Sequence, residues 1–81
     1  MKCTDAIRFA MMQDGVTQAD MARWIDYTTP SGVANALNRK HGMRVDVFVR
    51  MANALGYEII MRRGTDEIVI HETVTTRNIQ I

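Results

Sequence analysis

The chain has 81 residues, of which 47% are hydrophobic and 23% charged, and this composition indicates one small globular domain and excludes a largely disordered chain. The net charge of +1 does not by itself indicate a nucleic-acid-binding protein. A domain of this size buries only about 60% of its unfolded surface, so a dimer interface is expected.

Several classes of site are not predicted. The single cysteine, Cys3, has no partner for a disulfide or a zinc site, and we expect a small apolar role in a reducing, cytoplasmic setting. No run of about 18 apolar residues predicts a membrane span, and Asp5 and Asp14 argue against a signal peptide. His41 and His71 lack the spacing of metal ligands. With no nucleophile–base pair or phosphate loop, we expect neither an enzyme nor a cofactor.

A first helix is predicted from a cap at Thr4 to about Asp14, where Gly15 supplies a left-handed stop. Its apolar positions recur at helical spacing, at Ile7, Ala10 and Met11, with Phe9 and Met12 on a flanking face.

The start of a second helix has a complete set of capping signals. Thr17 is a favourable N-cap, and Asp20 three residues later forms a shortened capping box. We expect the helix to end near Asp26. Its buried stripe is Met21, Ala22 and Ile25, and Trp24 is expected to pack against the core, with a surface anchor as the alternative.

The segment "TTPSGVANALNRK" predicts a third helix from Pro30 to about Arg39, because Thr29 can cap it and proline suits the first helical position. At about 100° per residue, the apolar side chains of Val33, Ala36 and Leu37 share one face. The opposite face carries Ser31, Asn35 and Asn38. Poor helix formers replace the Glu and Lys of an ordinary solvated face.

Basic side chains gather just after this helix. No acidic residue occurs between Asp26 and Asp46, and the interval holds Arg39, Lys40, His41 and Arg44. A local basic segment on a nearly neutral chain is an electrostatic indication of an anionic partner.

A fourth helix is predicted from about Val45 to Leu55, followed by a stop at Gly56. After it, "YEIIMRR" and "EIVIHETV" flank the turn signal "GTD", which predicts a β-hairpin. The last residues, 75–81, could be a further strand, a swapped arm or a frayed tail. The expected fold is therefore mainly α with a C-terminal β-hairpin.

Helices two and three are joined by a short turn of about four residues, the connection typical of a helix-turn-helix, whose second helix enters the DNA major groove. An Asn side chain can bond bidentately to adenine, and Ser can donate or accept. The alternative is an ordinary solvated face.

The stretches "TQADMARWIDYTTPSGVANALNRK" and "MANALG" resemble the helix-turn-helix of Cro-like and lambda-repressor-like regulators of the xenobiotic-response-element type, over about residues 4–56. Asp26 stands where that family usually has glycine, and the turn is about one residue longer. Pro30 replaces a polar base-contacting side chain, and Gly32 offers none. The resemblance implies a four-helix lambda-repressor-like domain over residues 1–56, with residues 57–81 completing the same domain.

The resemblance also implies roles for individual residues. Those expected at bases are Thr29, Ser31, Asn35 and Asn38, the last near the backbone at the far end of the helix. Those expected at phosphates are Thr17, Gln18, Arg39, Lys40 and Arg44. Gln18, Arg39 and Lys40 could instead be simply solvated.

The hairpin is expected to pair across a twofold axis through Ile68, Val69 and Ile70, the alternative being a cover for the monomer's own core. Together these features predict a sequence-specific regulator of double-stranded DNA, a repressor that binds a short palindromic operator as a homodimer. The alternative is a protein-binding module on the same fold, such as an antitoxin or a mobile-element inhibitor of a host protein.

Overall fold

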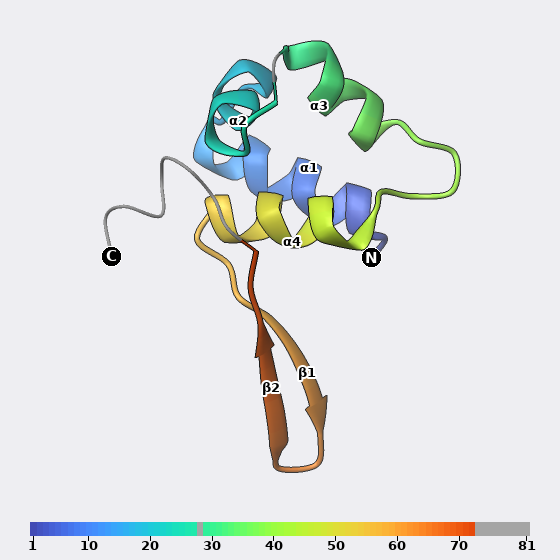
Figure 1. Ribbon diagram of the computed structural model, residues 1–81, viewed down its shortest axis with the longest axis vertical. Helices are drawn as coiled ribbons and strands as arrows, with labels where there is room; N and C mark the ends of the chain where they lie inside the picture. The colour runs from blue at the N-terminus through green and yellow to red at the C-terminus, as the bar shows by residue number, and fades with distance from the viewer. Residues whose placement is uncertain (28, 73–81) are drawn as a thin grey trace.

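The computed structural model describes residues 1–27 and 29–72, which form four helices followed by a two-stranded antiparallel hairpin (Figure 1). In chain order the elements are α1 (Cys3–Asp14), α2 (Gln18–Trp24), α3 (Pro30–Leu37), α4 (Val45–Ala54), β1 (Ile59–Arg63) and β2 (Asp66–Ile70). The predicted class, mainly helical with a C-terminal hairpin, is confirmed. The expectations for residues 73–81 lie outside the described residues. Within the described part, no helix is long and apolar enough to cross a membrane.

The predicted cap of α1 is wrong. The helix begins at Cys3, and its N-cap is Lys2, whose side chain makes no capping hydrogen bond. Thr4 therefore lies inside the first turn. The predicted end is confirmed, because Gly15 adopts a left-handed φ of 66° and donates to the Met11 and Met12 carbonyls.

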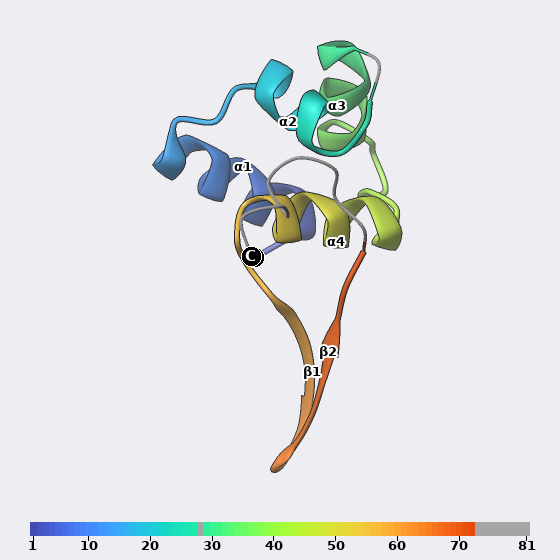
Figure 2. The ribbon, with the colours of Figure 1, turned by 60° about the vertical axis from the view of Figure 1, so that its left-hand side comes forward.

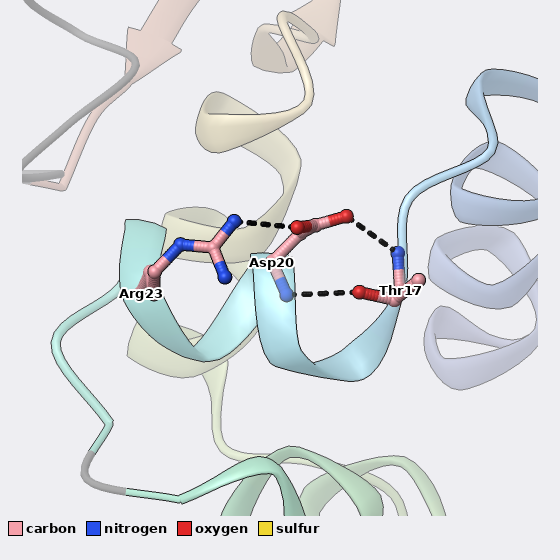
Figure 3. Close-up of polar contacts among 3 residues, drawn as sticks. All are labelled: Thr17, Asp20 and Arg23. Atoms are coloured by element: carbon pink, nitrogen blue, oxygen red, sulfur yellow. Dashed lines mark hydrogen bonds and ion pairs between the residues drawn. The ribbon is translucent and has the colours of Figure 1, made fainter.

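The capping box of α2 is confirmed (Figure 3). Asp20 N donates to Thr17 Oγ1 at 3.1 Å, and Thr17 N donates to Asp20 Oδ2 at 3.1 Å. The Arg23 guanidinium lies 2.5 Å from Asp20 Oδ1. The backbone N–H of Thr17, followed by the Arg23 side chain, holds the pKa of Asp20 below its usual value.

Both helices of the central pair end earlier than predicted. α2 ends at Trp24, and Asp26 follows with a φ of 66°. α3 ends at Leu37, with Asn38 as its C-cap. Each end is held by an arginine from another helix, which satisfies carbonyls that have no partner inside the helix. Arg50 of α4 donates to the Ile25 carbonyl, and Arg8 of α1 donates to the Leu37 carbonyl at 2.9 Å.

The core lies between the four helices, and its largest fully buried side chains are Met21, Ile25, Val33, Val49 and Met51. The apolar stripes predicted for the first three helices are buried, and Trp24 packs partly buried against this core, as expected. α4 closes the bundle and ends at Ala54, with Gly56 two residues later at a φ of 92°.

The hairpin projects away from the helical body (Figures 1 and 2). Its two-residue turn has a positive φ at Gly64 alone, as in a type II′ turn, and Asp66 pairs with Arg63. The sequence signal "GTD" placed Asp66 in the turn. In the structure Asp66 begins β2 instead. Only Ile59 and Ile70, at the base, are partly shielded; the other strand residues are exposed. Of the described strand residues, Ile59 packs against the core, so the hairpin covers the core only at its base.

One side chain ties the hairpin to the body at both of its ends. Asn53 of α4 donates through Nδ2 to the Tyr57 carbonyl at 3.0 Å, just before β1. Its Oδ1 accepts from the backbone N–H of Glu72 at 3.0 Å, just after β2. Because both strands are held by the same carboxamide, Asn53 fixes the direction in which the hairpin leaves the helices.

Candidate nucleic-acid interface

The helix pair predicted to form a helix-turn-helix is present as two packed helices. α2 and α3 lie against each other, and the connection between them runs from Ile25 to Thr29. Figure 1 shows α2 on one side of α3 and the connection to α4 on the other. α3 is therefore flanked by the two segments that carry the predicted phosphate contacts.

The two faces of α3 divide as predicted. Its apolar side chains are buried, whereas Ser31 and Asn35 are exposed, and Asn35 also lines a recess. The helix contains no acidic residue. Thr29 occupies the N-cap position, but its hydroxyl makes no capping bond. That hydroxyl lies 2.9 Å from Ser31 Oγ, so the two hydroxyls form one polar group at the start of the helix.

Asn35 and Asn38, both expected at bases, have different surroundings. Asn38 follows α3 as its C-cap, and its Oδ1 accepts a hydrogen bond from the Arg8 guanidinium. A bidentate contact with adenine needs both the oxygen and the NH₂ group of a carboxamide. The contact with Arg8 takes one of the two lone pairs of the Asn38 oxygen and ties this side chain to α1, which makes Asn38 a poorer reader than Asn35. Asn35 has no side-chain hydrogen bond to any described residue, so both of its groups are available.

A shallow recess of about 230 Å³ lies beside the polar face of α3. It is lined by Tyr27, Gly32, Asn35, Ala36, Arg39, Arg44 and Val47. The Arg44 guanidinium lies 3.1 Å from an Asp46 carboxylate oxygen, whereas Arg39 has no ionic partner among residues 1–27 and 29–72. The recess therefore combines an amide, an aromatic ring and two arginines, a set that suits an anionic polymer with planar bases.

Tyr27 is a residue that the sequence interpretation missed. Its half-buried ring packs against the core and covers the start of α3. A Cβ atom at position 32 would lie 2.9 Å from Tyr27 Cδ2, closer than such atoms normally come. This contact explains Gly32, because only a residue without a side chain leaves room for the ring. The pair of a tyrosine before the helix and a glycine inside it was the available signal.

The predicted phosphate contacts are all exposed. Thr17 and Gln18 lie at the start of α2, where the Thr17 hydroxyl is occupied by the capping box. Arg39 and Lys40 were predicted at the end of α3. They lie after it, in the connection to α4. Neither side chain has a hydrogen bond or an ion pair to the described part of the chain. These cations therefore keep their charge available for a partner.

The three residues predicted for dimerisation do not share one face of the hairpin. Cross-strand partners lie on the same face, so Ile68 lies with Met61, and Ile70 lies with Ile59. Val69 lies on the opposite face, with Ile60. The Ile68 and Met61 side chains are about 60% exposed, at 61% and 58%, and Met61 was missed because only the second strand was considered.

Comparisons of the chain with protein-family models, with curated proteins and with solved structures found no match.

Proposed function

We propose that this protein is a sequence-specific regulator of double-stranded DNA that places α3 in the major groove, on a lambda-repressor-like helix-turn-helix fold. One observation carries the proposal: Asn35 presents a carboxamide without intramolecular partners, among the described residues, on an acid-free helix face. A solvated face with no binding role would be cheaper to build from Glu and Lys, which are better helix formers than Ser and Asn.

In this proposal bases and phosphates are contacted by different residues. Asn35 bonds a base edge, and the joined hydroxyls of Thr29 and Ser31 contact an adjacent base. Phosphates bind Arg39, Lys40 and Arg44 on one side of α3 and Thr17 and Gln18 on the other. The phosphate contacts supply most of the affinity and make it depend on salt, whereas the base contacts supply sequence preference.

The position of the hairpin supports a homodimer. α3 lies at one end of the longest axis and the hairpin tip at the other (Figures 1 and 2). A twofold axis parallel to the hairpin would pair the exposed faces that carry Met61 and Ile68, and both α3 helices would face the same way. The molecule is 40 Å long, and 32 Å and 21 Å across. The proposed dimer predicts that the two α3 helices lie roughly 34–36 Å apart, the length of one DNA turn.

Selection of bound sequences from a pool of random DNA duplexes tests this function. A palindrome should be enriched, with half-sites about one helical turn apart. Asn35→Ala should then lose discrimination between the selected and unrelated sequences, with weak, salt-sensitive binding retained. Gln13→Ala, which removes an exposed carboxamide from α1, is the matched control and should discriminate like the wild type. If Asn35→Ala discriminated as well as this control, the reading face would be wrongly placed.

The phosphate contacts are tested by the double variant Arg39→Ala and Lys40→Ala. Its affinity should fall for all sequences alike, and the slope of log affinity against log salt should shrink by about 0.9 for each phosphate that is no longer neutralised. An unchanged slope would remove both residues from the interface.

A repressor in the cytoplasm would act by occupying a promoter and blocking the polymerase.

A second candidate function has its own observation. The hairpin carries a recess of about 240 Å³ lined by Met61, Arg62, Arg63, Asp66 and Ile68. An exposed apolar site between charged side chains also suits a protein partner, as in an antitoxin or an inhibitor of a host protein. A protein that enriches no DNA sequence and remains monomeric in solution would favour this candidate.

A further inference from the structure

A third recess opens where the start of α1 meets the connection between α3 and α4. It has a volume of about 460 Å³ and is lined by residues 2–4 from one side and 39–43 from the other. Arg39 lines both this recess and the one beside α3. The two hollows therefore share Arg39, although their other lining residues differ.

The lining of this recess is basic. Lys2, Arg39, Lys40 and His41 are all exposed, and no acidic residue lines the hollow. None of these four side chains has a hydrogen bond or an ion pair within the described ranges. Asp5, one turn into α1, is the nearest acid in sequence to Lys2, and it does not belong to the lining. The unpaired charges of Lys2, Arg39 and Lys40, which converge from two segments on one hollow, produce a positive potential suited to an anion.

We propose that this basic recess binds a backbone phosphate of the DNA outside the base pairs read by α3, with Lys2 as a contact that the helix-turn-helix unit does not contain. The inference rests on the proposed function, because Arg39 links the recess to the face of α3. A strand whose phosphate sits beside Arg39 would continue into the hollow lined by Lys2 and Lys40. The footprint on DNA would then extend beyond the half-site.

Salt dependence measures such a contact directly. One phosphate contact contributes a slope of about −0.9, so a fourfold rise in salt costs about 3.5-fold in affinity per contact. We compare the factor by which affinity falls when salt is raised from about 50 to 200 mM. For Lys2→Gln this factor should be smaller than for the wild type by about 3.5-fold for each protomer. The Lys2 side chain makes no capping bond, so the variant should fold normally, which circular dichroism checks.

A matched variant and a second duplex complete the experiment. Arg62→Gln also removes one positive charge, but on the hairpin face opposite Met61 and Ile68, where the Arg62 side chain is 64% exposed, and it should keep the wild-type slope. On a duplex trimmed to the base pairs enriched by selection, the flanking phosphates are gone, and the wild type and Lys2→Gln should have equal slopes.

The outcomes separate this inference from the proposed function. A Lys2→Gln slope equal to that of Arg62→Gln on the long duplex would overturn the recess and leave DNA binding intact. A wild type that binds no duplex would overturn both. A reduced Lys2→Gln slope together with unchanged discrimination by Asn35→Ala would support the recess and refute base reading by Asn35.

Discussion

Replacing Gly32 by alanine sets two effects of similar size against each other. Alanine is a better helix former than glycine by about 1 kcal/mol, which would stabilise α3. The new methyl group, however, would lie 2.9 Å from Tyr27 Cδ2, so the ring must move. Forcing an extra methyl group into packed side chains costs about 1–3 kcal/mol. We therefore expect Gly32→Ala to leave the free energy of unfolding unchanged or to lower it by up to about 2 kcal/mol.

A double-mutant cycle isolates the contact with Tyr27. In a Tyr27→Ala background the methyl group has space, and Gly32→Ala should raise the free energy of unfolding by about 1 kcal/mol. The coupling between the two positions should thus be about 1–3 kcal/mol, measured by urea unfolding of the four proteins. The reasoning would be refuted if Gly32→Ala stabilised the wild type and the Tyr27→Ala protein equally.

Three further predictions concern single positions. Asp26 has a left-handed φ of 66°, which suits glycine better than alanine. Asp26→Ala should therefore lower the free energy of unfolding by up to about 1 kcal/mol, whereas Asp26→Gly should leave it unchanged or raise it. Urea unfolding of both variants checks which of them is the more stable. Asn53→Ala should speed hydrogen exchange at the Glu72 amide about fivefold, which corresponds to about 1 kcal/mol for the missing hydrogen bond, while amides inside α4 keep their protection. The folded pKa of Asp20 is lowered, so its contribution to stability is present above the unfolded pKa of about 3.9 and is lost as the pH falls through the folded value. Urea midpoints of Asp20→Asn should therefore fall less than those of the wild type between neutral pH and that acidic range; parallel profiles would contradict the Asp20 assignment.

Local signals identified every helix and the hairpin, because each is encoded within a few neighbouring residues. The box of Thr17 and Asp20 located the start of α2, and Thr29 with Pro30 located the start of α3. The ends of α2 and α3 were less accurate because residues remote in sequence hold them. Arg8, 29 residues before Leu37, holds the end of α3.

The candidate site was predictable only in part for the same reason. Helical spacing separated the polar face of Asn35 from the buried Val33, and this division holds. The same spacing grouped Asn38 with Asn35, but it cannot reveal that Arg8 holds the Asn38 oxygen. Nor can it show that Lys2 lines the same hollow as Arg39, because that proximity arises only when α1 packs beside the connection to α4.

The separation of α3 from the hairpin along the longest axis has an evolutionary consequence. Substitutions at positions more than about 7–10 Å apart, with no shared partners, act additively on free energy. In the proposed dimer, changes at Met61 and Ile68 would therefore alter which chains associate without altering the operator proposed for α3. Two paralogues in one cell could then avoid mixed dimers through a few hairpin substitutions, each keeping its ancestral binding site.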